Sequence, residues 1–224
     1  MESLILDIED IVPEYYFSLG LNGGGKETTE GPRVLHLLAS LLERAIQKNE
    51  KLLEAMKKKE SVTVFHGLRA PNLSIRRYIE RIFKYSKCSP SCFVLAQVYI
   101  DRFLQQPNMH LTSLNVHRLL ITSVVVAAKF IDDAFYNNAY YAKVGGVGTL
   151  EMNRLELNFL FCLDFRLQVT VGTFDKYCLL LEKEALTDGY QIERPIKVCS
   201  LKCCANKEEY KGQEAIRRYS CGAI

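Results

Sequence analysis

Two charged residues stand side by side in the middle of an apolar segment, YIDRFL, at residues 99–104. Burying an unpaired carboxylate such as that of Asp101 is costly, so a natural chain keeps one there only when a cation or a set of donors meets it. The candidate cations upstream are Arg76 and Arg77. The residue types therefore predict a structural charge pairing rather than a reacting group.

Four charged residues in all lie in apolar surroundings: Arg76, Asp101, Lys129 and Glu156. Each could simply extend to the surface at the edge of a helix, and for a single Lys or Glu this is the more common arrangement. Four such residues within one helical unit are harder to explain in this way. The pattern indicates a set of specific contacts, and we propose no catalytic role for any of the four.

Two segments look superficially like nucleotide-handling motifs. Residues 126–129 read VAAK, as in the phosphate-binding strand of protein kinases, but no glycine-rich loop precedes them and no HRD or DFG follows. Residues 145–148 read GGVG and lack the Gly-Lys-Ser/Thr of a phosphate loop, so they are typical of a turn between helices that uses positive φ. We therefore expect no enzyme, no cofactor and no small-molecule substrate.

The chain has eight cysteines, which could suggest a disulfide scaffold. Half of them fall in apolar stretches with helical patterning, which is typical of reduced thiols in a protein of the nucleus or cytoplasm. These four are Cys88, Cys92, Cys162 and Cys178.

The C-terminal cysteines suggest two further possibilities. Cys199, Cys203 and Cys204 have neither a nearby histidine nor the paired CxxC spacing of a zinc site, so no metal is expected. The ending Cys221-Gly222-Ala223-Ile224 has the outline of a prenylation box, but glycine and alanine are poor substitutes for its aliphatic residues. Lipidation is not expected.

The composition suits one globular domain with flanking segments. The chain has 224 residues, 48% of them hydrophobic, and a net charge of +3, which argues against a general nucleic-acid binder. The first residues carry acids where a signal peptide needs a basic region, and no uncharged apolar run reaches the roughly 18 residues of a membrane span. We expect a nuclear or cytoplasmic protein that is neither secreted nor stably inserted in a membrane.

The periodicity predicts an all-α chain in four parts. Residues 1–32 form an acidic and Gly-rich flexible arm, and residues 33–60 form a helix with one apolar stripe. That stripe could be a coiled-coil seam, but three heptads are marginal for one, so we expect the helix to dock on its own domain. Residues 61–186 hold further helices without an alternating strand pattern, and residues 187–224 form a mostly irregular tail.

Within the helical unit, segments near 90–105 and 112–132 are apolar on nearly every face, which is typical of buried helices. Another helix follows, which Thr149 can cap and which ends near Cys162. A last helix covers about residues 173–185.

Several motifs, in order and at matching spacing, resemble a known family. The strings YIDRFL, VAAKF and LELNFLFCLDFRL, after an Arg-bearing helix, resemble the cyclin box. The stretch from 61 to 185, which includes SVTVFHGL, ERIFKYSKCS, NVHRLLITSVVVAAKF and NNAYYAKVGG, is similar to plant U-type (also called P-type) cyclins. That group is similar to the yeast cyclin of the phosphate-starvation response. The resemblance covers over half the chain and implies a single five-helix cyclin box.

The resemblance implies roles for the four charged residues. An Arg of the first box helix pairs with the Asp of the second in this family, which falls on Arg76 and Asp101 as a structural buried ion pair. The family's Lys and Glu that contact the kinase's regulatory helix and the segment before it fall on Lys129 and Glu156. The implied partner is a cyclin-dependent protein kinase.

The implied function is that of a non-catalytic regulatory subunit that binds and activates this kinase, in cell-cycle or nutrient (phosphate) signalling. An alternative is a helical adaptor without a kinase partner, since a fold alone does not fix function. A nucleic-acid role would need a continuous basic face, but the runs at 57–59 and 76–77 are interspersed with acids.

The first box helix also departs from the family pattern for substrate docking. Arg77 and Arg81 stand where cell-cycle cyclins with a docking patch have apolar or acidic residues, and Ile82 stands in place of a Trp. A conventional docking groove is therefore not expected.

Overall fold

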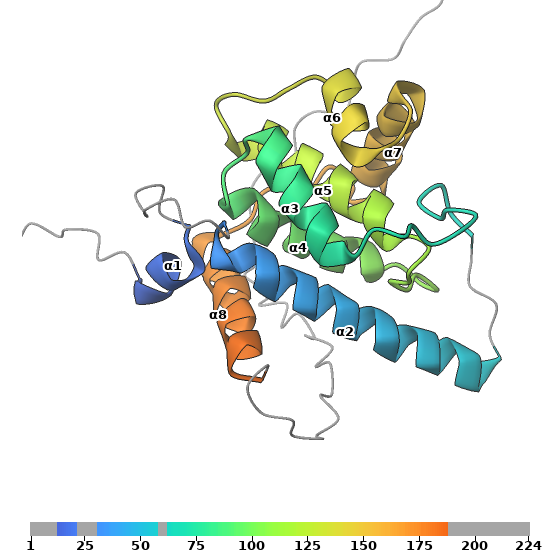
Figure 1. Ribbon diagram of the computed structural model, residues 1–224, viewed down its shortest axis with the longest axis horizontal. Helices are drawn as coiled ribbons and strands as arrows, with labels where there is room; N and C mark the ends of the chain where they lie inside the picture. Colours follow the sequence, from blue (N-terminus) through green and yellow to red (C-terminus); the bar gives the residue numbers. More distant parts are fainter. Residues whose placement is uncertain (1–12, 22–30, 58–61, 188–224) are drawn as a thin grey trace, which may run out of the picture. The chain divides into compact units, whose positions relative to one another are not determined.

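The computed structural model describes residues 13–21, 31–57 and 62–187, and within these ranges the chain forms eight helices and no strand (Figure 1). The prediction of an all-α fold is confirmed. Cys199, Cys203, Cys204 and Cys221, for which the sequence predicts neither a metal site nor lipidation, lie outside the described residues. The helices are α1 (Glu14–Leu19), α2 (Arg33–Met56), α3 (Ile75–Ser86), α4 (Ser91–Leu104), α5 (Val116–Ile131), α6 (Asn138–Gly145), α7 (Thr149–Cys162) and α8 (Val171–Thr187).

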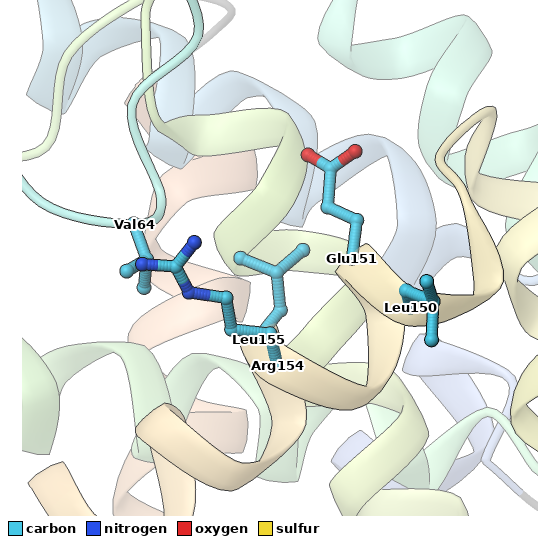
Figure 2. A pocket seen from close by; sticks show the side chains of 5 residues that line it. All are labelled: Val64, Leu150, Glu151, Arg154 and Leu155. Atoms are coloured by element: carbon cyan, nitrogen blue, oxygen red, sulfur yellow. The ribbon is translucent and has the colours of Figure 1, made fainter.

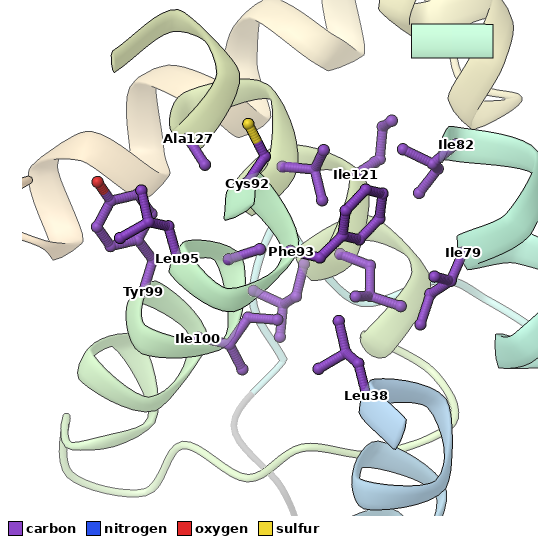
Figure 3. Close-up of a cluster of buried hydrophobic side chains, with 14 of the residues drawn as sticks. Leu38, Ile79, Ile82, Cys92, Phe93, Leu95, Tyr99, Ile100, Ile121 and Ala127 are labelled. Carbon is purple, nitrogen blue, oxygen red and sulfur yellow. The ribbon is translucent and has the colours of Figure 1, made fainter. Parts of the chain in front are cut away.

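Helices α4 and α5 form the centre of the packing. Their apolar residues point in every direction, and α5 is buried at each position from 119 to 128, as the sequence predicts. Figure 3 shows how Phe93 of α4 and Ile121 of α5 meet Leu38 of α2 and Ile79 of α3. None of the helices in the described ranges has both the length and the apolarity needed to cross a membrane.

The long helix α2 buries apolar side chains through little more than its first half. Its buried side chains end at Ile46, whereas Leu52 and Met56 are 47% and 60% exposed. Between them, the side chain of Asn49 donates a hydrogen bond of 3.0 Å to the backbone oxygen of Leu111. The expected docking is therefore correct for the N-terminal half, but the sequence stripe wrongly extends it to Leu52 and Met56.

The N-terminal arm contains a short helix that the sequence pattern did not predict. Leu19 of α1 is fully buried, and the hydroxyl of Tyr16 donates a 2.6 Å hydrogen bond to Asp175 of α8. Six residues are too few to establish a helical period in a sequence, so this element depends on its contacts with α8 and α2.

The turn between α6 and α7 agrees with the sequence prediction in its backbone conformation but not in the helix cap. Gly146 ends α6 with a φ of +71°, which confirms the predicted turn with positive φ. Thr149, however, is the first residue of α7 rather than its cap; the N-cap is Gly148, and no side chain caps this helix. This turn brings the start of α7 back against α6, with which it packs.

Candidate functional site

Two of the predicted site residues, Lys129 and Glu156, belong to one hydrogen-bonded network. The Lys129 ammonium donates to Oε1 of Glu156 at 2.6 Å and to Oδ1 of Asn138 at 2.8 Å. The Asn138 amide donates in turn to Oε2 of Glu156 at 2.6 Å and to Asn153 at 2.8 Å. We call these four residues the Lys129 network.

Three helices position this network. Lys129 lies in the last turn of α5, Asn138 is the first residue of α6, and Glu156 lies in the middle of α7; all three helices pack on one another. The side chains of Lys129 and Glu156 remain 28% and 16% exposed. The pair is thus partly desolvated, which strengthens the attraction between the charges, yet solvent and partners can still reach it.

Asn138 and Asn153 are the members of the network that sequence reasoning missed, and Asn138 is the one that contacts both charges. It stands in a polar stretch beside Asn137, whose side chain caps α6 by accepting from the backbone N–H of Tyr140 at 3.0 Å. The available signal was this pair of asparagines at the start of a helix. Only the packing of α6 against α7 shows that the second asparagine faces a glutamate.

The end of α5 is held in place by Asp132. Its carboxylate accepts hydrogen bonds from the backbone N–H of Ser89 at 3.0 Å, from the Ser89 hydroxyl at 2.7 Å and from the Cys92 thiol at 3.3 Å. These contacts tie the C-terminal end of α5 to the N-terminal end of α4. Lys129, three residues earlier, therefore lies on a segment whose C-terminal end is held in place.

Large apolar side chains are exposed on the same segments as the network. Phe130, Ile131 and Phe135 follow Lys129 and are 48%, 40% and 52% exposed. Leu157 and Phe161 follow Glu156 on α7 and are 53% and 62% exposed. Exposed apolar groups around a few fixed polar groups are typical of a protein-docking surface.

The structure contradicts the predicted buried ion pair between Arg76 and Asp101. The Arg76 side chain is 57% exposed and donates to Glu80, one turn along the same helix, at 3.1 Å. Asp101 instead accepts hydrogen bonds from the Gln97 amide at 2.8 Å and from the Tyr177 hydroxyl at 2.9 Å. Neutral donors, rather than a cation, satisfy this carboxylate.

The physical reason is the orientation of α3. Its buried residues lie at positions 75, 78, 79 and 82, which form one helical stripe, and position 76 falls outside this stripe, on the exposed side of the helix. Without a cation nearby, burial raises the pKa of Asp101 to about 6, although the hydrogen bonds from Tyr177 and Gln97 act in the opposite direction.

A shallow hollow of about 360 Å³ lies at the start of α7 (Figure 2). Glu151 on its wall accepts a 2.7 Å hydrogen bond from Arg118 of α5. Its lining, within the described residues, holds no nucleophile beside a base and no cluster of metal ligands. The lining residues are Val64, Leu150, Glu151, Arg154 and Leu155.

Comparison with known proteins identifies the family of this chain. The family model described as Cyclin matches residues 33–167. This chain belongs to the cyclin family. The cyclin match begins with α2, and it ends before α8.

Plant relatives show which group of cyclins this chain is similar to. It is 61% identical over 199 residues to Cyclin-P3-1 of Oryza sativa subsp. japonica, which covers 88% of this chain and 84% of the relative. It is 51% identical over 211 residues to Cyclin-U3-1 of Arabidopsis thaliana, which covers 94% of each. The resemblance to plant U-type and P-type cyclins is confirmed. Cyclins are regulatory subunits of kinases, generally without catalysis of their own, and this family membership supports such a role.

Proposed function

We propose that this cyclin binds and activates a cyclin-dependent protein serine/threonine kinase through the Lys129 network and the apolar side chains beside it. The observation that carries the proposal is the closed set of hydrogen bonds among Lys129, Asn138 and Glu156, flanked by exposed Phe130 and Leu157. A set of polar groups with fixed positions at the margin of an apolar surface supports docking in one register.

The proposed mechanism acts on the partner's geometry. Phosphoryl transfer in a kinase requires the Lys–Glu pair between strand β3 and helix αC, together with the metal-binding Asp. A protein that holds αC in its inward position can therefore switch the enzyme on without touching substrate. In this proposal the cyclin contributes no catalytic group.

The network has bonding capacity left for such a partner. A lysine ammonium has three donors, and the two bonds to Glu156 and Asn138 leave one of them. Because Lys129 and Glu156 neutralise each other, a kinase helix can be buried against them without facing an unpaired charge. Exposed side chains such as Phe161 would supply the apolar area that drives association.

A binding experiment with purified cyclin-dependent kinases tests the proposal. The double variant Lys129→Met/Glu156→Gln removes both charges at once, so that neither is left buried alone. We expect kinase affinity to fall at least about tenfold, and histone phosphorylation at limiting cyclin to fall in parallel. Calorimetry measures the affinity, and thermal unfolding measures whether the fold is retained.

A second ion pair between the same two helices provides the matched control. Arg118 of α5 and Glu151 of α7 lie 2.7 Å apart, near the other end of α5. The variant Arg118→Met/Glu151→Gln should bind the kinase like the wild type. Equal affinity in both double variants would contradict the contact role. If the wild-type protein binds none of the kinases tested, the helical adaptor becomes the better proposal.

The signalling output and the location are further parts of the proposal. We propose that the complex acts in cell division or in the response to phosphate supply, and that it resides in the nucleus, the cytoplasm or both. The family membership supports a regulatory output of this kind. Comparing the associated kinase activity between dividing and phosphate-starved plant cells, together with imaging of a fluorescent fusion, would separate these alternatives.

A further inference from the structure

Positive charge is concentrated in one segment of this protein. Residues 75–87, which comprise α3 and the residue that caps it, hold five cations and one acid, whereas the entire chain has a net charge of only +3. This single segment thus carries more net positive charge than the whole protein. The cations are Arg76, Arg77, Arg81, Lys84 and Lys87, and the acid is Glu80.

Three of these cations form a line on the outer face of α3. Arg77, Arg81 and Lys84 are exposed and follow one another at intervals of four and three residues, which places them on the same side of a helix. The exposed Lys143 of α6 adjoins this line, because its backbone oxygen accepts from Nη2 of Arg81 at 3.2 Å. We call these four residues the basic strip.

The stability of α3 does not explain the basic strip. Like charges at these intervals repel one another and weaken a helix. Among the residues that the structure describes, the only ion pair on α3 is the one between Arg76 and Glu80, and neither of these belongs to the strip. Arg77, Arg81 and Lys84 therefore form no ion pair within the part of the chain that the structure describes, although Glu80 lies one turn from Arg77 and from Lys84.

One cation of the strip is held in position before any partner arrives. The Arg81 guanidinium donates from Nε to the backbone oxygen of Val144 at 2.8 Å and from Nη2 to that of Lys143. These carbonyls belong to the last turn of α6, where the helix dipole favours a cation. Arg81 nevertheless stays exposed, so a partner gains a preorganised charge at little cost in side-chain entropy.

We propose that the basic strip binds an extended, acidic polypeptide segment of a partner protein. Arg77 and Lys84 are about 10 Å apart along the helix axis at 1.5 Å per residue, which is the span of about three extended residues. Carboxylates at alternate positions of an extended chain are about 6.6 Å apart, close to the 6 Å rise from Arg77 to Arg81. A run of Asp or Glu can therefore place carboxylates opposite Arg77 and Arg81, and the flexible side chain of Lys84 can reach a further carboxylate of the same run.

Two other anionic partners fit less well. A protein that binds duplex DNA commonly neutralises about 6 to 10 phosphates, which exceeds the four cations of the strip. A membrane-surface helix needs large apolar side chains beside its cations, but the only exposed one on α3 is Tyr85, at 47%. The strip therefore favours a short peptide.

Fluorescence anisotropy of a fluorescein-labelled peptide with a run of glutamates tests this proposal. We expect the wild-type cyclin to bind it with an affinity that falls as salt rises, and the variant Arg77→Glu/Lys84→Glu to bind at least about tenfold more weakly. The matched control, Lys51→Glu/Lys176→Glu, reverses two exposed charges on α2 and α8 and should bind like the wild type.

Other outcomes would overturn the proposal. Equal loss in both double variants would show a general charge effect, and no binding by the wild type would exclude the site. Tighter binding of duplex DNA, or of vesicles containing phosphatidylserine, would assign the strip to a different partner. Should the reversal variant fail to fold by circular dichroism, Arg77→Gln/Lys84→Gln provides the same comparison. None of these measurements requires the kinase.

Discussion

Asp101 illustrates how a carboxylate that is partly removed from water can be satisfied without an opposite charge. The Tyr177 hydroxyl and the Gln97 amide each donate to one of its two oxygens. These hydrogen bonds favour the ionised form of Asp101, but burial disfavours that form more strongly. The pKa of Asp101 therefore rises from the ordinary value of 3.8 to about 6. The residue therefore links the stability of the fold to pH.

We predict that Asp101→Asn alters the pH dependence of stability. Because the pKa of Asp101 is raised on folding, its contribution to stability is fully present below pH 3.8 and is lost as pH rises through about 6. The Asn side chain stays neutral. The buried Oε1 of Gln97 has no hydrogen-bond partner among the described residues, and after a flip of the Gln97 amide it can accept from the new Asn side chain. Urea unfolding across this range should show the wild type losing stability relative to the variant as pH rises. Parallel profiles would contradict the assignment.

Close packing joins α3, α5 and α6 at Gly145. The Tyr78 hydroxyl donates to the backbone oxygen of Gly145 at 3.0 Å, and a Cβ at this position would lie 2.9 Å from Cγ1 of Ile121. Contacts this short do not occur for real Cβ atoms, so the interface between these helices requires a glycine. This packing sets the position of α6, and thereby of Asn138 at its start.

We predict that Gly145→Ala lowers the free energy of unfolding by about 1 to 3 kcal/mol, the usual range for overpacking. Gly172→Ala is the matched control, because nothing lies within 4 Å of a Cβ there and the residue belongs to helix α8. That substitution should stabilise the protein by up to about 1 kcal/mol through the lower entropy of the unfolded chain. Urea denaturation of both variants checks the contrast, and a neutral Gly145→Ala would refute the close packing.

At the scale of the whole molecule, the free cyclin leaves a set of large apolar side chains uncovered around the Lys129 network. Leu157 and Phe161 are 53% and 62% exposed, so they contribute little to the core. Their exposure makes sense if a partner covers them. A change at these positions should therefore affect binding rather than folding.

We predict that Leu157→Ser/Phe161→Ser keeps the melting temperature of the wild type within a few degrees but weakens kinase binding at least about tenfold, because each side chain would bury apolar area on association. The control Leu68→Ser/Val171→Ser changes two residues that are even more exposed, at 103% and 75%, outside the proposed contact surface. Calorimetric titration of a purified kinase compares the two. If the control loses as much affinity, the proposed surface is wrong.

The sequence predicted the central elements well because their signal is local. An apolar character on every face of α4 and α5 indicates buried helices regardless of what surrounds them. Lys129 and Glu156 could be singled out because each is a charge in apolar surroundings. Asn138 could not, because an asparagine in a polar loop looks ordinary until its neighbour is known.

The sequence by itself determined the all-α class, the buried helices and the family, because helical periodicity and motif spacing are properties of neighbouring residues. The tertiary structure alone decided which distant residue meets Asp101, namely Tyr177, 76 positions away. It also decided that Arg76 faces outward and that Met56 lies beyond the packed half of α2. A residue's position on a helix surface follows from the sequence, but which surface is covered depends on packing between elements distant in the chain.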